Sequence, residues 1–451
     1  MSGGEWAELR GREGAGLQET IFPIKRSGRR WTRAWRWSAK GGSAVTDQGL
    51  FAGTNFVLNV LLARWLTPAE YGAFAIAYSV FLLLALIHSA VLLEPMMVFG
   101  SGKYFEQRKT YLGIVLRGHW LLAVPSGLLL VGAGYVLGVL YSRSAGRALC
   151  ALGLVLPAVL LVRLTRQAFY VELQPARAAA GGAVYMCCLL AMAWWLHVER
   201  MLSPVTAVLA MGAAALVAGG LQRAWLHPRR YRGWKELIPK EPALDHWAYG
   251  RWALASALAT WMAWNAYYLA LPLWFGLQSA GALRALLNLV NPINHSMMAV
   301  GMLALPLFVR HREGRGLARM RQTVRRVAGA LAAGSMVYFV ILWLFGERLI
   351  HLLYAGRYEG YSGLPLLLAG LSPLAAACSI VLGGALNACM RPDKVFWGYL
   401  AAGGTALSFG LWLSERWGVA GALGGMLGSN VVLALTFWMF YRTLGGESAP
   451  A

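Results

Sequence analysis

Two apolar runs follow one another between Asp47 and Tyr104, and only the short segment LTPAE separates them. A helix needs about 20 apolar residues to cross a hydrocarbon core that is about 30 Å thick. Each run is long enough, so this stretch predicts two membrane-spanning helices joined by a tight turn. A polar loop that opens with Glu94 and Pro95 is predicted to follow the second helix.

Composition extends this interpretation to the whole chain. Of its 451 residues, 58% are hydrophobic and 13% are charged, whereas soluble domains carry about 25% charged residues. We therefore predict an all-α polytopic membrane protein with about 12 transmembrane helices. The predicted spans are 46–66, 71–93, 111–141, 148–171, 177–197, 204–225, 247–271, 279–308, 324–345, 362–389, 395–413 and 418–441.

The distribution of basic residues predicts the orientation. A net charge of +22 could indicate a nucleic-acid partner, but the basic residues lie in the gaps between apolar runs, so no nucleic-acid binding is predicted. With the N-terminus inside, 29 of the 41 Lys and Arg residues lie on the cytoplasmic side, seven lie outside and five lie within spans. Because Lys and Arg accumulate in cytoplasmic loops, both termini are predicted to be cytoplasmic.

The polar segment 226–246 divides the predicted spans into two equal sets. Pro157 and Pro373 stand at matching places in the two halves, and Tyr71-Gly72-Ala73 has a counterpart in Ala280-Gly281-Ala282. Chance could produce such matches, but two six-helix lobes around a central cavity are the simplest interpretation. The predicted units are a basic cytoplasmic tail (1–44), an N-lobe (45–225), a cytoplasmic linker (226–246), a C-lobe (247–442) and a cytoplasmic tail (443–451).

The basic tail admits two interpretations. Its basic residues would share one face of a helix, which suits a helix lying on an anionic cytoplasmic leaflet. A disordered tail, or a start site placed too early, is the alternative. The residues concerned are Arg29, Arg33, Arg36 and Lys40.

Polar side chains at membrane depth form two stripes. One stripe, in the first predicted helix, consists of Gln48, Asn55 and Asn59 at spacings of 0, 7 and 11. The other, in the eighth, consists of Arg284, Asn288, Asn291 and His295 at 0, 4, 7 and 11. These spacings place each set on one helical face, and amides facing lipid would be costly. We therefore predict that both stripes face inward, the first toward protein or a wet cavity and the second toward a cavity.

A cation in line with amides suits an anionic, hydrogen-bonding substrate such as a sugar phosphate. A purely structural polar seam is the alternative. Arg251, in the first turn of the seventh span, is a second candidate cation, although it could equally reach the cytoplasmic surface. Arg163 and Arg166 share a face near the cytoplasmic end of the fourth span and are weaker candidates.

The residues that are missing exclude several function classes. No carboxylate lies near the middle of a predicted span, because Asp47, Glu94 and Glu172 all lie toward cytoplasmic ends. A cation-coupled exporter usually needs a buried acid, and a membrane enzyme would need acids or bases in an outer loop. The outer segment 346–360 offers only a weak set, and no Walker motif or paired His and Cys spacing occurs. No catalytic residue, cofactor or metal site is predicted.

The segment ARWLTPAEYGAFAIAYS, within the longer run DQGLFAGTNF…EPMMVFG, resembles the N-terminal region of polysaccharide biosynthesis proteins. These are the O-antigen and exopolysaccharide flippase-like members of the multidrug/oligosaccharidyl-lipid/polysaccharide exporter superfamily. GLPLLLAGLSP…GGALNACMRPDK resembles a C-lobe helix of the same family. The likeness spans most of 45–442.

The resemblance implies a two-lobed flippase that moves an undecaprenyl-diphosphate-linked oligosaccharide across the bacterial inner membrane. It implies a cationic cavity between the lobes, with Arg284 as the best match and Arg251 second. A polysaccharide polymerase and a chain-length regulator would be its partners. Lipid II flippases carry arginine deep in the first helix, whereas this chain has Gln48, Asn55 and Asn59 there, which favours another glycan. A cation-coupled multidrug antiporter of the same superfamily and a membrane enzyme of polysaccharide assembly are the alternatives.

Overall fold

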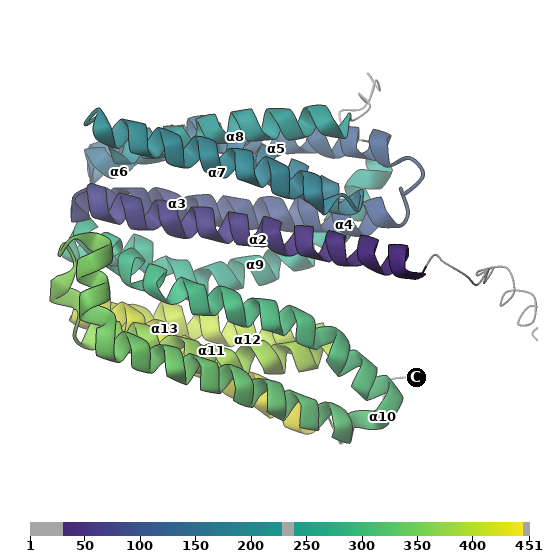
Figure 1. The fold of residues 1–451 in the computed structure, drawn as a ribbon. Helices are drawn as coiled ribbons and strands as arrows, with labels where there is room; N and C mark the ends of the chain where they lie inside the picture. The colour runs from purple at the N-terminus through teal and green to yellow at the C-terminus, as the bar shows by residue number, and fades with distance from the viewer. Residues whose placement is uncertain (1–29, 228–238, 445–451) are drawn as a thin grey trace, which may run out of the picture.

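The computed structural model describes residues 30–227 and 239–444, and in these ranges the chain is helical without a β-strand (Figure 1). The first half contains α2 (Arg30–Trp65), α3 (Pro68–His88), the π-helix η1 (Ser89–Leu93), α4 (Glu94–Ser101), α5 (Arg108–Leu140), α6 (Arg143–Val171), α7 (Pro175–Val198) and α8 (Pro204–Leu226). The second half contains α9 (Lys240–Phe275), α10 (Leu277–Tyr354), the 3-10 helix η2 (Glu359–Tyr361), α11 (Leu364–Ala388), α12 (Pro392–Thr405), the π-helix η3 (Ala406–Gly410) and α13 (Leu411–Thr443).

Two of these long helices are interrupted. The backbone leaves helical geometry at Gly316, which divides α10 into two antiparallel arms, and again at Trp417 and Gly418 in α13. Among the described residues, nine helices are long and apolar enough to cross a membrane, and the last of them, Asp393–Thr443, contains the break in α13. Both halves of that segment, together with the more polar α2 and α9, complete the 12 spans that the sequence predicts.

The start of α3 shows how the sequence forms the predicted tight turn. Thr67 caps the helix, because its hydroxyl accepts a hydrogen bond from the backbone N–H of Glu70 at 3.3 Å. The Glu70 carboxylate accepts one in return from the backbone N–H of Thr67 at 3.0 Å. Pro68 occupies the first turn, where a missing N–H removes no helical hydrogen bond. This capping box reverses the chain within LTPAE.

The predicted loop at Glu94 and Pro95 is wrong. The chain stays helical there, passing through η1 into α4 and ending at Ser101. Pro95 lies in the first turn of α4, where proline is tolerated, and the wider π-turn precedes it. The predicted outer segment 346–360 is also mostly helical, because α10 continues to Tyr354.

Residues 30–44, which we assigned to the basic tail, are helical and continuous with the first span in α2. The boundary predicted at residue 44 therefore falls inside a helix. Residues 1–29, most of the predicted linker, and 445–451 lie outside the described residues.

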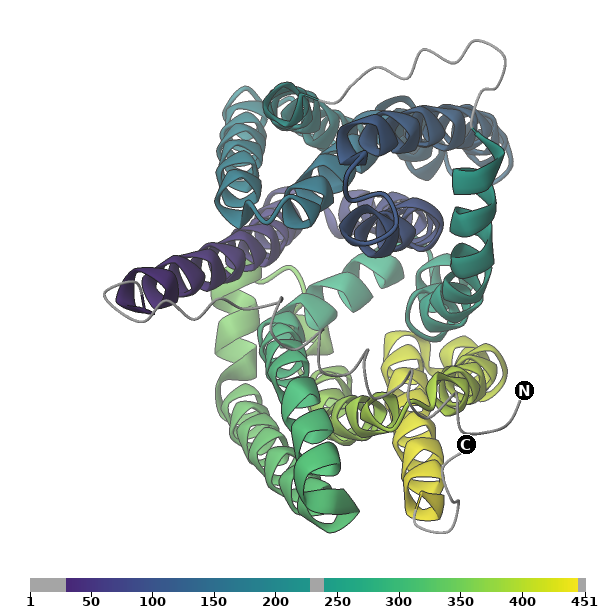
Figure 2. The ribbon, with the colours of Figure 1, turned by 90° about the vertical axis from the view of Figure 1, so that its right-hand side faces the viewer.

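The two halves form separate lobes that meet at one end. Figure 2, which looks along the bundle, shows α2–α8 on one side and α10–α13 on the other. They touch where α3 and α10 begin. The two backbones approach so closely there that a Cβ added to Gly72 would overlap the Leu277 carbonyl oxygen and lie 3.3 Å from the Gly281 backbone nitrogen. The side chain of Arg64 also crosses there, donating to the Leu352 carbonyl at 2.9 Å. The two glycine motifs that suggested an internal repeat thus form part of the lobe contact.

Helix α9 connects the two lobes. Its first turns pack on η1 and α4. The loop after α4 also reaches them: the Lys103 ammonium lies 2.8 Å from the Asp245 carboxylate, and the Tyr104 hydroxyl donates to that carboxylate at 2.7 Å. Further along, Trp261 Nε1 donates to the Ser79 carbonyl of α3 at 3.0 Å. Its second half packs on α12 and α13. Although the prediction assigned α9 to the C-lobe, it contacts both lobes.

Candidate functional site: a cavity between the lobes

A cavity of about 630 Å³ lies between the lobes. Its walls come from nearly every long helix around it, and its polar lining consists of Asn55, Tyr78, Arg163, Tyr185, Thr260, Asn265, Tyr268, Arg284, Asn288, Asn291, Asn294, His295, Ser372, Ser379, Tyr399 and Asn430. The remaining lining is aliphatic and aromatic. A polar cavity of this size among apolar helices is costly to keep, which makes it the candidate functional site.

The ionisable side chains that matter for the charge of the lining are basic. Two arginines, Arg163 and Arg284, and His295 face the cavity, and no Asp or Glu is among the lining residues that the structure describes. Amides supply both donors and acceptors beside these cations. An anion that also carries hydroxyl or amide groups fits this combination.

Arg284 projects from α10 toward the N-lobe. Its Nε donates to Asn59 Oδ1 of α2 at 2.9 Å, and its guanidinium carbon lies 4.0 Å from the ring centroid of Tyr78. The Tyr71 hydroxyl donates to the same Asn59 oxygen at 3.0 Å. Arg284 therefore links the lobes while it borders the cavity, so its guanidinium is available both to a bound anion and to the lobe contact.

The rest of the stripe on α10 follows Arg284 along the cavity wall. Asn288 Nδ2 lies 3.5 Å from the Phe56 carbonyl of α2, and Asn291 Nδ2 donates to Asn288 Oδ1 at 3.3 Å. His295 lies further along, with an exposed side chain in the cavity lining. The spacing correctly places all four residues on one face, and that face borders the cavity.

The three residues of the stripe predicted on α2 lie in different places. Asn55 lines the cavity and accepts a hydrogen bond from the Tyr78 hydroxyl at 3.0 Å. Asn59 is buried behind the lining, where it bonds Arg284. Gln48 is exposed and lies outside the lining, and so does the exposed Arg251 of α9. Both precede the cavity along their helices, because the lining begins at Phe51 on α2 and at Thr260 on α9.

Arg163, a weaker candidate from the sequence, is part of the lining. Its Nε is buried and has no hydrogen-bond partner in the described part of the chain. The neighbouring Arg166 is instead paired with the buried Asp47, whose carboxylate lies 2.8 Å from Arg166 Nε and 2.6 Å from the Tyr170 hydroxyl. Because Asp47 is neutralised by Arg166, the charge of Arg163 remains available to the cavity. The signal in the sequence was the spacing of Arg163 and Arg166, which places them on one helical face.

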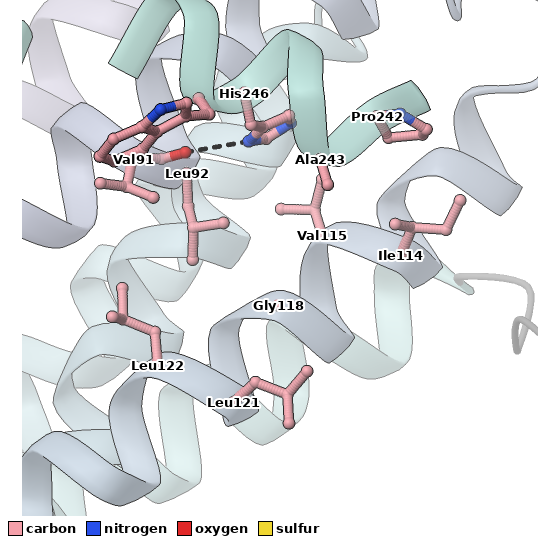
Figure 3. Close-up of a pocket in the computed structure, with 11 residues that line it drawn as sticks. Val91, Leu92, Ile114, Val115, Gly118, Leu121, Leu122, Pro242, Ala243 and His246 are labelled. Atoms are coloured by element: carbon pink, nitrogen blue, oxygen red, sulfur yellow. Dashed lines mark hydrogen bonds between the residues drawn. The ribbon is translucent and has the colours of Figure 1, made fainter. Parts of the chain in front are cut away.

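A smaller cavity of about 280 Å³ lies between η1, α5 and the start of α9 (Figure 3). Its lining is almost entirely apolar, and Figure 3 shows His246 bonded across it to the Val91 carbonyl, at 2.9 Å from Nδ1. The Tyr111 hydroxyl lies 2.6 Å from His246 Nε2, so both ring nitrogens are engaged. This cavity lacks the cations and amides that a charged substrate needs. The described residues also contain no cluster of three or more His, Cys, Asp or Glu side chains that could hold a metal ion.

Comparison with known proteins rests on structure alone, because no family model and no curated protein matches the chain. An inward-facing MATE-family multidrug resistance transporter of the MOP superfamily matches with a TM-score of 0.72 at 12% identity, over 89% of this chain and 97% of that one. The lipid II flippase MurJ, in an inward closed conformation, matches with a TM-score of 0.69 at 11% identity, over 89% and 87%. The chain has the fold of the MOP-superfamily transporters.

Within the MOP fold, pocket polarity varies among similar structures. A MOP-superfamily transporter from Pyrococcus furiosus, described as having a binding pocket of reverse polarity that suggests a different function, matches with a TM-score of 0.64 at 12% identity, over 89% and 93%. The chemistry of the lining, rather than the MOP fold itself, must therefore indicate the substrate.

Proposed function

We propose that the protein is a flippase that moves a lipid-linked oligosaccharide, carried on undecaprenyl diphosphate, across the bacterial inner membrane. The product would enter surface polysaccharide assembly, such as O-antigen or exopolysaccharide, with a polymerase and a chain-length regulator as partners. The N- and C-termini would be cytoplasmic. One observation carries the proposal: the cavity between the lobes is lined by Arg163, Arg284 and His295 together with amides, and by no carboxylate among the described residues.

These residues would bind the two parts of the headgroup, the diphosphate and the sugars. A diphosphate would bind the guanidinium groups of Arg163 and Arg284, because planar guanidinium donors match phosphate oxygens. The sugars would lie along the asparagines, which can donate to and accept from hydroxyl groups. The apolar lipid would remain in the bilayer. Release on the other side would require the lobes to separate where they now touch, so the contact between Arg284 and Asn59 would open.

The test is transfer of a fluorescent undecaprenyl-diphosphate oligosaccharide between the leaflets of proteoliposomes. Because a hydrogen bond to a charged group contributes about 1.5–3 kcal/mol, Arg163→Ala and Arg284→Ala should each slow transfer by about 10- to 100-fold. Arg348→Ala is the matched control, since Arg348 is an exposed arginine of the same helix as Arg284 and lies outside the lining. Its transfer rate should equal that of the wild type.

The result for each variant also assigns its residue. Normal transfer by Arg163→Ala and Arg284→Ala would contradict the proposed site. Loss in Arg163→Ala alone would leave Arg284 as a structural link between the lobes.

A cation-coupled multidrug antiporter is the second candidate, and the similarity to a MATE-family transporter favours it. A cationic drug would have to enter a cavity whose charged lining is itself cationic, which costs electrostatic energy. Efflux of a cationic dye from the same proteoliposomes, without glycolipid transfer, would favour the antiporter.

A further inference from the structure

A separate basic pocket of about 450 Å³ lies in the C-lobe, between α10, α11 and α13. It is lined by Arg321, Val324, Arg325, Ala328, Cys378, Leu382, Trp438, Tyr441 and Arg442. None of these residues lines the cavity between the lobes. The pocket is thus separate from the cavity of the proposed transport route.

The pocket is polar at one end and apolar at the other. Arg321 and Arg325 lie just after the bend at Gly316, and Arg442 lies in the last turn of α13. Ala328 lies about 10 Å further along the helix than Arg321, at about 1.5 Å per residue, and the Leu382 side chain from α11 joins it in the lining. With cytoplasmic termini, the basic end faces the cytoplasmic headgroups and the apolar end faces the acyl chains.

The guanidinium groups and the tyrosine hydroxyl of this pocket have no hydrogen-bond or ion-pair partner among the described residues. The described part of the chain provides no hydrogen bond or ion pair to Arg321, Arg325 or Arg442, although the Arg442 guanidinium carbon lies 4.6 Å from the Trp438 ring centroid. The Tyr441 hydroxyl is buried, has no hydrogen-bond partner among the described residues, and lines the same pocket as Arg321 and Arg325. No acidic side chain is among the described lining residues. Three cations and a free hydroxyl donor therefore converge with no acceptor.

We propose that this pocket binds the phosphate headgroup of an anionic phospholipid of the cytoplasmic leaflet. The phosphate oxygens would accept from the guanidinium groups and from the Tyr441 hydroxyl, and one acyl chain would lie along Ala328 and Leu382. Basic pockets between transmembrane helices on the cytoplasmic side are suited to such headgroups. The apolar half of the lining argues for a lipid and against free phosphate. The bound lipid would join α10, α11 and α13 at their cytoplasmic ends and stabilise the C-lobe.

Native mass spectrometry of the full-length protein in detergent tests the proposal, with phosphatidylglycerol and phosphatidylcholine of equal chain length offered together. The wild type should retain phosphatidylglycerol preferentially, and Arg321→Gln/Arg325→Gln should lower that retention by about tenfold or more. Arg326→Gln is the matched control, because Arg326 is the adjacent, exposed arginine and lies outside the lining. It should retain the lipid as the wild type does.

Two further variants keep the test decisive if the double variant does not fold. Arg442→Gln and Tyr441→Phe should each weaken phosphatidylglycerol retention severalfold. Equal loss in Arg326→Gln would show general attraction to a basic surface and would overturn the proposal, as would equal retention of phosphatidylcholine. Displacement of the lipid by inorganic phosphate at low millimolar concentration would show a phosphate site instead. Since no transported substrate is present, failure here leaves the proposed flippase function unaffected.

Discussion

At the scale of single residues, the N-lobe contains a buried pair of histidines that the proposed function does not use. His88 Nε2 of α3 lies 3.0 Å from His119 Nδ1 of α5, and both side chains are fully buried. A single His119→Leu substitution would leave a buried imidazole without its partner, at a cost of about 1–3 kcal/mol. We therefore expect each single leucine variant to unfold at a lower temperature than the wild type. His88→Leu/His119→Leu should be less destabilised than the sum of the two, because no polar group is left unpaired.

Thermal unfolding in one detergent gives the four unfolding temperatures, those of the wild type, the two single variants and the double variant. Additive losses in the double variant would contradict the pairing. His197→Leu is a useful comparison, because His197 is exposed and stacks on Trp65 at 4.2 Å between centroids. Its unfolding temperature should change less than that of either buried variant.

Individual residues also show what the sequence can predict about the site. Helical spacing identifies which side chains share a face, so it groups Arg284, Asn288, Asn291 and His295 correctly. Spacing does not identify the neighbouring helix, so it could not show that Arg166 pairs with Asp47 while Arg163 remains in the cavity. The pairing of Arg166 with Asp47 depends on a contact between residues more than 100 positions apart, which helical spacing does not reveal.

At the scale of the elements, the start of α9 is held to the N-lobe by an ionic cluster outside the spans. Lys103 lies 2.8 Å from Asp245 and 2.9 Å from Glu241. Partial burial opposes ionisation of Asp245, but hydrogen bonds from Lys103 and Tyr104 outweigh it and hold the pKa of that carboxyl below its usual range. Burial, and then the bond to Asp245, raise the pKa of Tyr104 to about 12. The cluster is therefore charged and intact at neutral pH.

The lowered pKa of Asp245 determines how the stability of this cluster depends on pH. A carboxyl whose pKa is lower in the folded state stabilises the fold above its unfolded pKa of about 4 and loses this contribution as the pH falls through the folded value. Hydrogen exchange of residues 240–250 should thus be unchanged between pH 8 and 6, after correction for intrinsic rates. Asp245→Asn should make exchange severalfold faster in this segment, and the more exposed Glu241→Gln should have a smaller effect. Equal exchange in Asp245→Asn and the wild type would contradict a role for the cluster.

Prediction from sequence succeeds and fails at this scale for physical reasons. Span positions follow from apolar length, and the structure has the predicted all-helical fold. The error at Glu94 and Pro95 arose because a proline need not end a helix: the π-turn of η1 precedes Pro95, which lies in the first turn of α4, where proline is tolerated. Mean hydropathy does not place α2 and α9 among the helices that are apolar enough to cross a membrane. Both helices are more polar because they contribute side chains such as Asn55, Thr260 and Asn265 to the cavity.

At the scale of the whole molecule, the two lobes can rock only if their contact opens and closes. That contact relies on Gly72 and Gly281, since a Cβ on either would overlap backbone of the opposite helix: the Leu277 carbonyl for Gly72 and the Pro68 carbonyl for Gly281. The two glycine motifs that the sequence analysis matched thus lie on two helices that approach without intervening side chains. Overpacking at such a contact costs about 1–3 kcal/mol, and this cost applies only while the lobes touch.

Gly72→Ala should therefore shift the protein away from the observed closed end by about 5- to 150-fold, as every 1.4 kcal/mol is tenfold. Distances between spin labels at exposed sites on either side of this contact, measured by pulsed electron paramagnetic resonance, report the shift. Gly132→Ala is the matched control, because a Cβ there meets nothing within 4 Å, and its distances should equal those of the wild type. If Gly72→Ala leaves the distance distribution unchanged, the two glycines are not what allows the lobes to close, and the contact must be maintained by Arg64 and Arg284 instead.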